Sequence, residues 1–585
     1  MAGMTQTAPE SALEHIHAPL GVIHRLFETH ASENAGGYSA SDFGKLAQTH
    51  FQSVFGGSNA VKRIPVYDQA QTELKSGSLV RFRCMVQDPG YGEELHLSVA
   101  RIMNCETGEQ QQKFSQYTDA EHRLDDGWEV DYGSAANVFT EKEVAYCVSV
   151  PGQSAWAQLE ADSLESAMEA MSLGGGGSSK FAQSAEKYPI PGQRHSAALV
   201  KFYAPSTAPK ASTVIDVVGI FELGHNARAR ETGDESAAWP CIHAIYHREV
   251  QSHELLPALP PVQPSEYAGR RAMCLTHLAS VLGGDELAAQ YLLLHLLSKT
   301  VRVQDAKVGK LALNLIGVPA GSEPQPAEFA FGNRASRWVG EAVSQLVPFS
   351  VSVPFNLQLL NKSSFTPNAE QGDLRAGVLQ LAPGTEVLCD ETCLSEGTLD
   401  ERGVRNLQAM QTAIIDQTVS YVYPFQPIEM PTSLRVLVLS TGKSILHSDC
   451  EVHVSESSRQ FLASVARAGP PADVRPLDPM HSEQLRQYVE LARHLDFGIP
   501  KDVSDHISGE YAASRRNAHS KGEAMVTQEE LALTITVARL ISVSKGESEL
   551  SVESWAEAVA LEQRRKERNA QAKQKSTSKS AAPPS

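Results

Sequence analysis

An acidic pair, Asp390–Glu391, follows the apolar residues Val387–Cys389 in the string VLCDE. In P-loop ATPases, a carboxylate pair at the end of a buried strand orients the magnesium ion and polarises the attacking water. Acidic residues also end many strands simply because they cap the next helix. The pair therefore points to nucleotide hydrolysis without establishing it.

Such a pair needs a phosphate-binding loop, G-x-x-x-x-G-K-[ST], after an earlier strand. The apolar strand predicted at 310–318 is followed by PAGSE at 319–323, which has no lysine for the β- and γ-phosphates and adds the negative charge of Glu323. The one GKS string, Gly442–Ser444, follows a later strand and is predicted to be a polar turn. We therefore expect no catalytic residue and no cofactor, and we expect the acidic pair to be inactive.

Two histidines make the best case for a metal site. His243 and His247 are four residues apart, with Glu249 and His253 close by. On a helix this spacing places both on one face, as zinc ligands require. The H-E-x-x-H pattern is absent, so half-buried histidines without a metal are the favoured interpretation. Nucleophilic catalysis has less support, because no G-x-S-x-G string occurs and Cys389 lies in an apolar strand, where a thiol is usually unreactive.

The composition narrows the classes of function. The chain has 585 residues, 42% of them hydrophobic, and its 51 Lys and Arg against 69 Asp and Glu give a net charge of −18. This length predicts about three or four domains, and so acidic a chain is poorly suited to coating DNA, because non-specific binding neutralises phosphates. Eight scattered cysteines do not form a disulfide framework, and neither a secretory signal nor a bilayer-spanning helix is evident. We expect a soluble protein of a reducing compartment with no membrane partner.

The periodicity of apolar residues assigns the first half of the chain to a helical segment and a β-rich domain. Residues 1–60 are predicted to be helical, because apolar residues recur every three or four positions. Alternating runs such as LVRFRCMVQD predict strands over 61–156 and 191–254, which we expect to form one OB-like barrel. Between these parts, 157–190 contains GGGGSS at 174–179 and is predicted to be a flexible insertion.

The second half alternates helices with short apolar strands. Over 255–475, the runs KLALNLIGV, SVSVPFNLQLL, GVLQLAP, TEVLCDE and LRVLVLS predict a parallel sheet covered on both faces. Residues 476–562 are predicted to be helical. Residues 563–585 are predicted to be a basic, disordered tail. Its basic residues could serve nuclear import or contact with nucleic acid, or they could simply keep the terminus soluble, and the two interpretations have equal weight. The predicted fold class is therefore multidomain, with α+β and α/β parts.

Several strings resemble landmarks of the mini-chromosome maintenance (MCM) complex-binding protein family and occur in the same order. They are PLGVIHRLF at 19–27, LVRFRCMVQD at 79–88, YCVSVPGQSAW at 146–156, ALVKFY at 198–203, GDELAAQYLLLHLLS at 284–298 and DETCLSEGTLDERGVRN at 390–406. In addition, AGVLQLAPGTEVLCDE at 376–391 is similar to the stretch that carries the acidic ATPase motif in MCM helicase subunits. Residues 531–561 resemble the helical lid of those subunits.

The resemblance implies a degenerate AAA+ domain of the MCM type over 255–475, with a helical lid over 476–562. Against that template, the phosphate loop is absent after Gly317, and Ser440 or Thr441 replaces the sensor asparagine. Ala532 stands where the lid of an active subunit supplies an arginine.

The same resemblance implies a function. The family is understood to bind MCM subunits and to help disassemble or chaperone the helicase complex in the nucleus, with effects on DNA replication, the cell cycle and sister-chromatid cohesion. We therefore expect a non-enzymatic binding protein whose acidic surface favours protein partners over DNA. Two alternatives stay open: a divergent ATPase that uses Asp390 and Glu391, and a single-strand binder that uses the barrel. The 6% aromatic content and the negative charge argue against the second.

Overall fold

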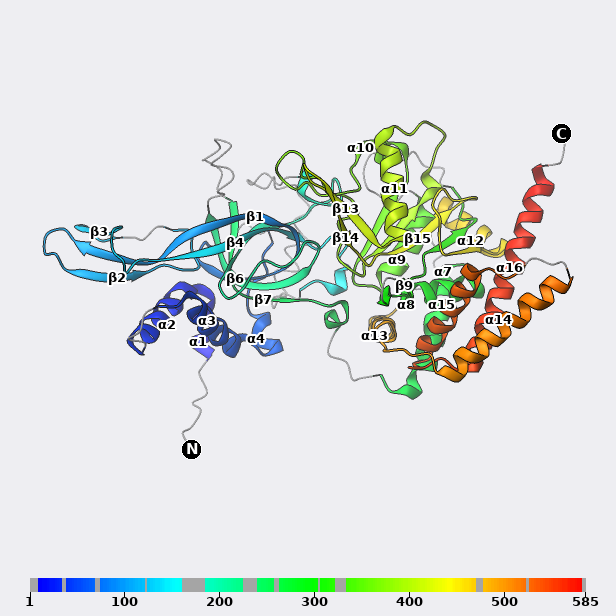
Figure 1. Cartoon of the computed structure of the whole chain (residues 1–585), viewed down its shortest axis with the longest axis horizontal. Coiled ribbons are helices and arrows are strands. Elements are labelled where there is room, and N and C mark those ends of the chain that lie inside the picture. The colour runs from blue at the N-terminus through cyan, green and yellow to red at the C-terminus, as the bar shows by residue number, and fades with distance from the viewer. Residues whose placement is uncertain are drawn as a thin grey trace. The chain divides into compact units, whose positions relative to one another are not determined.

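The chain divides into two compact units. Unit 1 comprises Met1–Val150, Gln158–Tyr188 and Arg194–Val250, and unit 2 comprises Pro151–Ala157, Pro189–Gln193 and Gln251–Ser585. Both units mix helices and strands, so the predicted mixture of α and β structure is confirmed (Figure 1). The computed structural model describes residues 9–33, 38–68, 74–120, 124–159, 185–224, 239–256, 262–303, 306–320, 333–469, 477–521 and 525–580. The GGGGSS string of the predicted insertion lies outside these ranges.

The strands of unit 1 form one sheet whose pairing closes on itself. The strands are β1 (Ser78–Asn104), β2 (Gln110–Phe114), β3 (Trp128–Val130), β4 (Val138–Ser149), β5 (Ala197–Tyr203), β6 (Val214–Gly224) and β7 (Trp239–Glu249). Strand β1 pairs with β4, β4 with β5, β5 with β7, β7 with β6, and β6 again with β1. Of these five pairs, β5–β7 is parallel and the others are antiparallel. Alternate side chains such as Phe82, Cys147 and Val200 fill the interior of this circuit.

Strand β1 extends well beyond the predicted string LVRFRCMVQD, because its pairing with β4 continues through three register shifts as far as Val99. Its first half pairs with β6, whereas Val99–Met103 pairs with β2 and Ile102–Asn104 with β3. We call the part of β1 from Glu93 onward, together with β2, β3 and the start of β4, the arm; Figure 1 shows it extending beyond the circuit.

The predicted N-terminal helices cover one face of this sheet. They are α1 (Pro9–His17), α2 (Pro19–Glu33), α3 (Ala40–Phe55) and α4 (Ser58–Lys62), and η2 (Ala185–Lys187) is a short helix elsewhere in the unit. The stacked rings of Phe27 and Phe114, with Phe43 at the edge of Phe114, join α2 and α3 to the sheet. The apolar spacing that predicts the helices therefore corresponds to the buried side of each.

Five strands form the central sheet of unit 2. In spatial order they are β11 (Ser350–Pro354), β12 (Glu386–Asp390), β15 (Arg435–Ser440), β10 (Leu313–Ile316) and β16 (Cys450–His453), and each neighbouring pair is parallel. Two hairpins accompany the sheet, one of β8 (Val301–Val303) with β9 (Ala306–Val308) and one of β13 (Thr418–Val422) with β14 (Pro427–Pro431). The short, wholly apolar runs of the sequence thus correspond to a parallel sheet.

Helices surround this sheet. They are α7 (Tyr267–Val281), α8 (Glu286–Leu297), α9 (Arg334–Ser344), α10 (Leu357–Lys362), α11 (Glu401–Ile415), α12 (Glu456–Ala468), α13 (Pro479–Arg493), α14 (Lys501–Lys521), α15 (Gln528–Ser544) and α16 (Val552–Ser580), with the short helices η1 (Ala155–Ala157), η3 (Ser252–Leu255), η4 (Pro264–Glu266) and η5 (Glu391–Cys393). Helix α8 is buried on nearly every side, which explains why its sequence has no polar stripe.

The landmark string YCVSVPGQSAW ends inside unit 2. Ser154 donates its hydroxyl to the carbonyls of Ser344 and Val347, at 2.9 and 2.7 Å, and the ring N–H of Trp156 donates to Ser344 at 3.1 Å. The guanidinium of Arg486 lies 4.6 Å from the centre of the Trp156 ring. Pro151–Ala157 therefore follows β4 along the chain but packs as part of unit 2.

Three predicted elements differ from the structure. The end of SVSVPFNLQLL is helix α10, because the side chain of Asn356 caps it by accepting from the N–H of Leu359. GVLQLAP is a buried turn rather than a strand, and the N–H groups of Val378 and Leu379 donate to loop carbonyls. The tail predicted to be disordered instead continues helix α16 from residue 563 as far as Ser580. Within this part of the helix, Arg565 forms an ion pair with Glu562, three residues before it.

Candidate functional site

The acidic pair lies at the carboxyl end of β12, beside the end of β15. Asp390 is the last residue of β12 and is buried. Its Oδ1 accepts hydrogen bonds from the backbone N–H and the hydroxyl of Thr392, at 3.1 and 2.5 Å, and its Oδ2 accepts one from the thiol of Cys393 at 3.2 Å. Asp390 thus acts as the cap of η5.

Glu391 is bound by the segment that contains the GKS string. Its Oε1 accepts hydrogen bonds from the hydroxyl of Ser444 at 2.7 Å and from the backbone N–H of Leu446 at 3.3 Å. Gly442–Ser444 follows β15 and makes no phosphate loop, since a phosphate loop leads from a strand directly into a helix. The serine of this string instead fixes the carboxylate of Glu391.

The backbone where β10 ends is already hydrogen-bonded. The N–H groups of Gly317 and Val318 donate to the carbonyl of Ser440 at 2.8 and 3.0 Å. Helix α9, the next helix described, is capped by its own side chain, because Asn333 Oδ1 accepts from the N–H groups of Ala335 and Ser336 at 2.7 and 2.9 Å. These N–H groups are therefore not directed at a ligand.

The other positions implied to be degenerate lie on two different elements. Ser440 ends β15, is buried, and donates its hydroxyl to Asn314 Oδ1 at 2.9 Å, while Thr441 is exposed. Ala532 lies exposed on α15. Ser440 is thus brought to the same edge of the sheet as the acidic pair.

Burial raises the pKa of both carboxyl groups of the acidic pair, although hydrogen bonds from Thr392 and Ser444 act in the opposite direction. A raised pKa means that the charged form, which a magnesium ion requires, is disfavoured at this place. Both oxygens of Asp390 also accept internal hydrogen bonds. This arrangement suits a structural cap better than a magnesium ligand.

We expect the substitution Asp390→Asn to leave the free energy of unfolding at pH 7 equal to or above that of the wild type. The pKa of Asp390 is raised in the folded state. The protonated carboxyl group therefore stabilises the fold at a pH below the unfolded-state pKa, and this contribution is lost as the pH rises through the folded-state pKa. Asparagine keeps the acceptor for Thr392 without the buried charge. Urea unfolding at pH 7 and pH 4 measures the difference, which should shrink at pH 4; a loss of several kcal/mol at pH 7 would contradict this prediction.

His243 and His247 do not lie on a helix, so they do not share the helix face that a metal site at this spacing requires. Both belong to strand β7, where a shift of register lies between them. His243 contacts the ring of Tyr203, and His247 contacts the ring of Phe202. Because consecutive residues of β5 point to opposite faces, the two histidines lie on opposite faces of the sheet. They cannot share a metal ion.

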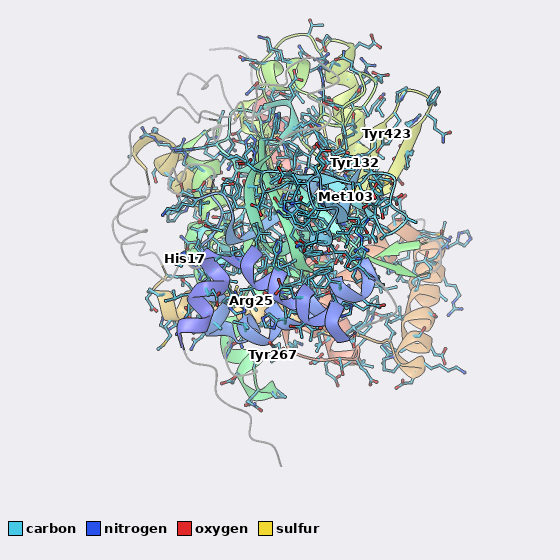
Figure 2. All side chains as sticks on the ribbon, turned by 90° about the vertical axis from the view of Figure 1, so that its left-hand side faces the viewer. His17, Arg25, Met103, Tyr132, Tyr267 and Tyr423 are labelled. Atoms are coloured by element: carbon cyan, nitrogen blue, oxygen red, sulfur yellow. The ribbon has the colours of Figure 1, made fainter. Side chains whose placement is uncertain are left out.

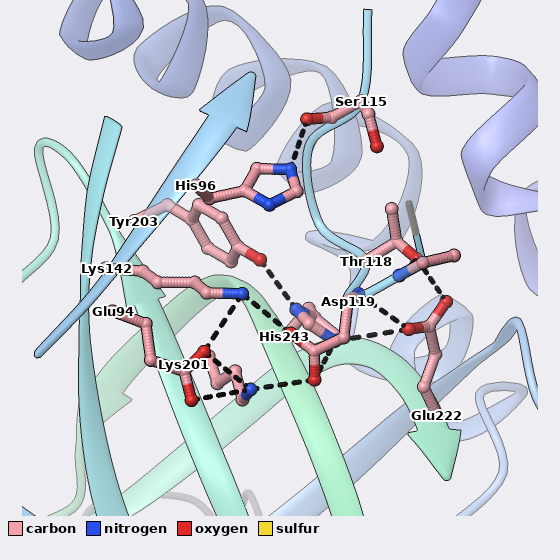
Figure 3. A network of polar contacts seen from close by, with 11 residues as sticks. Glu94, His96, Ser115, Thr118, Asp119, Lys142, Lys201, Tyr203, Glu222 and His243 are labelled. Atoms are coloured by element: carbon pink, nitrogen blue, oxygen red, sulfur yellow. Dashed lines mark hydrogen bonds and ion pairs between the residues drawn. The ribbon is translucent and has the colours of Figure 1, made fainter. Parts of the chain in front are cut away.

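His243 instead belongs to a buried polar network on the sheet of unit 1 (Figure 3). Lys201 Nζ lies 2.8 Å from Glu94 and 2.7 Å from Asp119, and Lys142 Nζ lies 3.1 Å from Glu94 and 2.6 Å from Asp119. His243 Nδ1 is 2.6 Å from the Tyr203 hydroxyl. We call these residues, together with Glu222, the lysine network.

Glu222 closes the lysine network on the other side of His243. Its carboxylate accepts from the hydroxyl of Thr118 at 2.7 Å and from the N–H of Asp119 at 2.9 Å, and it lies 3.4 Å from His243 Nε2. Burial would raise the pKa of Asp119, but the charges of His243 and Lys201 outweigh it and hold that pKa well below its usual value. The network therefore pairs its charges internally, as a structural cluster does.

The lysine network was not predicted from the sequence. The available signal is Lys201, which interrupts the apolar string ALVKFY and is fully buried in β5. A lysine is almost never fully buried unless it is paired, so one in a wholly buried strand indicates acidic partners. The identity of those partners depends on strands far apart in sequence.

The described residues contain neither a cluster suited to a metal ion nor a helix suited to a membrane. No three His, Cys, Asp or Glu side chains among them are arranged to hold a metal ion. No helix in the described ranges is long and apolar enough to cross a membrane. Cys389 is buried in β12, and burial raises the pKa of its thiol well above the usual value, which makes it unreactive.

The comparisons with known proteins match nearly the whole chain. The family model described as mini-chromosome maintenance replisome factor matches residues 51–174 and 166–569. The mini-chromosome maintenance complex-binding protein of Gallus gallus is 28% identical over 95% of this chain and 98% of its own length. Its namesakes of Arabidopsis thaliana and Homo sapiens are 27% and 26% identical, over 94% and 95% of this chain and 98% and 97% of their own lengths. Because the matched residues include both units, the chain belongs to the mini-chromosome maintenance replisome factor family.

Proposed function

We propose that this protein binds subunits of the MCM complex and does so without hydrolysing a nucleotide. The observation that carries the proposal is membership of the family along nearly the whole chain, with relatives that are named as binding the MCM complex. The net charge of −18 supports a protein partner rather than DNA, because phosphates are repelled by an acidic surface.

The hydrogen bonds at the edge of the parallel sheet support the non-catalytic part of the proposal. A phosphate held beyond β10 needs free N–H groups in the backbone that follows the strand. Those of Gly317 and Val318 already donate to Ser440, and Asn333 caps the first turn of α9. Asp390 and Glu391 also accept internal hydrogen bonds. Residues 321–332, between β10 and α9, lie outside the described ranges; in the described residues on either side of them, these contacts support a pseudo-ATPase, because the backbone N–H groups named above are already bonded.

We further propose that unit 1 contains an OB-like barrel and that unit 2 is a degenerate AAA+-like domain with α13–α16 as its lid. The closed circuit of five strands supports the first assignment. The parallel sheet, with an acidic pair at the end of β12 in its interior, supports the second. A domain of this kind takes the place of a helicase subunit in a complex and adds no hydrolysis.

The role of this binding is also a proposal. We infer that the protein acts in the nucleus, where it promotes unloading or chaperoned assembly of the MCM complex and thereby regulates DNA replication and sister-chromatid cohesion. The description of the family as a replisome factor supports this role. The basic end of α16, with the string RRK at 564–566, supports nuclear import.

The test is to co-express the full chain with each MCM subunit and to measure complexes by size exclusion with mass detection, without nucleotide. We expect a complex with at least one subunit. The variant Asp390→Asn/Glu391→Gln should form the same complex in the same yield, because it removes the charge of the acidic pair and leaves its surroundings intact.

The other outcomes separate the alternatives. Failure to form a complex with any subunit would contradict the binding function. A complex that requires ATP and is lost in the variant would favour the divergent ATPase that uses Asp390 and Glu391. A rise in the melting temperature of the wild type on addition of ATP would point the same way, because a ligand that binds the folded state stabilises it.

A further inference from the structure

The arm of unit 1 carries exposed apolar side chains on one face. Leu95 of β1 is 67% exposed, and Phe139 of β4 is 50% exposed. The register pairs Leu97 with Phe139 and Leu95 with Glu141 on adjacent antiparallel strands. Residues opposite one another, and every second residue along a strand, share a face. We call Leu95 and Phe139, together with the half-buried Leu97 between them on the same face, the arm patch.

The arm patch continues the face that forms the core of the circuit. Along β4, every second residue from Phe139 leads through Glu141 to Ala145 and Cys147, which are buried in that core. Lys142 points to the opposite face, where it joins the lysine network. Single exposed apolar residues are ordinary, but adjacent ones on one sheet face form a surface that gains from burial against a second molecule.

Carboxylates flank the arm patch. Glu93 and Glu141 are exposed and, by the register, lie on the same face as Leu95. An apolar centre with a negative rim is complementary to apolar side chains between lysines or arginines. DNA is a poor occupant, because these carboxylates repel phosphates.

The far end of the arm also carries exposed carboxylates. Figure 2 looks along the arm, with Met103 and Tyr132 near its end and the helices that carry His17 and Arg25 along one side. Tyr132 is 76% exposed, and β3 and the turns at this end of the arm carry several exposed carboxylates: Glu106, Glu109, Asp125, Asp126 and Glu129. The end of the arm is therefore also rich in exposed carboxylates, although the register shift between Leu97 and Val99 places Met103 and Glu129 on the other face of the strands.

We propose that the arm patch is the docking surface for a segment of an MCM subunit that presents apolar side chains between lysines or arginines. This inference rests on the proposed function and adds the contact surface and the chemistry of the partner. Antiparallel pairing of β1 with β4 fixes the patch, so binding orders little that is not already ordered. Phe139 is of the aromatic type that often anchors such contacts.

Two variants of the full chain test the proposal against purified MCM subunits, with dissociation constants measured by interferometry. Leu95→Ser/Phe139→Ser should weaken binding about tenfold or more, the loss expected when anchoring side chains are removed. Glu93→Lys/Glu141→Lys should also weaken binding and should reduce its dependence on salt, because screening acts on the charges of the rim. The matched controls are Leu223→Ser in unit 1 and Phe425→Ser in unit 2, whose side chains are 46% and 99% exposed.

The outcomes are distinguishable because the substituted side chains are exposed and the melting temperature shows that each variant folds. If the wild type binds a subunit and both arm variants bind it equally well, the arm patch is not the docking surface, and the proposed function still stands. Equal losses in the Leu223 or Phe425 controls also overturn it. A wild type that binds no subunit overturns both proposals. A wild-type dimer that Leu95→Ser/Phe139→Ser converts to a monomer assigns the patch to a second copy of this chain, against the proposal.

Discussion

Replacement of Lys201 by methionine is expected to destabilise unit 1 by about 3–5 kcal/mol, the usual cost of removing one partner from a buried ion cluster. Lys201 is 1% exposed and holds both Glu94 and Asp119. Without it, Lys142 is the one ammonium group left to Glu94 and Asp119, and because both carboxylates are largely buried, water replaces the lost hydrogen bonds only in part. Hydrogen exchange in peptides from β4 and β5, with urea unfolding, measures the loss and assigns it to unit 1.

Lys45→Met is the matched control. Lys45 pairs with Asp42 on the surface of α3, where both side chains are more than half exposed, so its loss should cost no more than about 0.5 kcal/mol. The cost of Lys201→Met should also shrink at acid pH. The pKa of Asp119 is held low in the folded state, so its stabilising contribution is present above its unfolded pKa and is lost as the pH falls. Equal stability of the two variants at pH 7 would show that the lysine network contributes nothing.

Secondary structure was predictable where apolar residues alternate with polar ones along an element. Val80, Phe82 and Cys84 line the apolar interior of the circuit, whereas Arg81 and Arg83 lie on the other face of β1, where they bond to the carbonyl of Ile64 and to Asp216. The same reasoning fails for GVLQLAP, where Val378 and Leu379 are apolar because the turn is buried and not because it is a strand. Apolar runs report burial, and the backbone conformation is decided by the hydrogen-bond partners that the rest of the fold provides.

The candidate sites likewise include features that were predictable from neighbouring residues and features that depend on the fold. The acidic pair was found because Asp390 and Glu391 are adjacent in sequence, and the sequence also shows that no G-x-x-x-x-G-K-[ST] string follows residues 310–318. The hydrogen bonds from the backbone N–H groups of Gly317 and Val318 to the carbonyl of Ser440 were not predictable, because they depend on the pairing of β10 with β15. The lysine network joins five strands and a loop, so its partners become evident only in the fold. A register shift in β7 likewise separates His243 from His247, and no spacing in the sequence records it.

Arg493→Met in α13 is expected to destabilise unit 2 by about 3–5 kcal/mol. Arg493 is buried, and its Nε and Nη2 donate to the carbonyl of Leu296 at 3.1 and 2.7 Å, while Nη1 donates to Glu490. Burial would raise the pKa of Glu490, but Arg493 and Arg435 hold it below its usual value. Methionine therefore leaves a buried carboxylate short of positive charge and a carbonyl in the last turn of α8 without its donors.

The double variant Glu490→Gln/Arg493→Met separates these two causes. If the cost of Arg493→Met comes chiefly from the stranded carboxylate, the glutamine removes that charge, and the double variant should be more stable than Arg493→Met alone. Urea unfolding of the wild type, the two single variants and the double variant at pH 7 gives the coupling, which we expect to be about 1–3 kcal/mol. At pH 4 the single variant should recover part of its loss, because protonation of Glu490 does what the glutamine does. Strictly additive costs would assign the effect to the capping of α8 by the guanidinium, so that Arg493 would stabilise the fold through Leu296 and not through its partner charge.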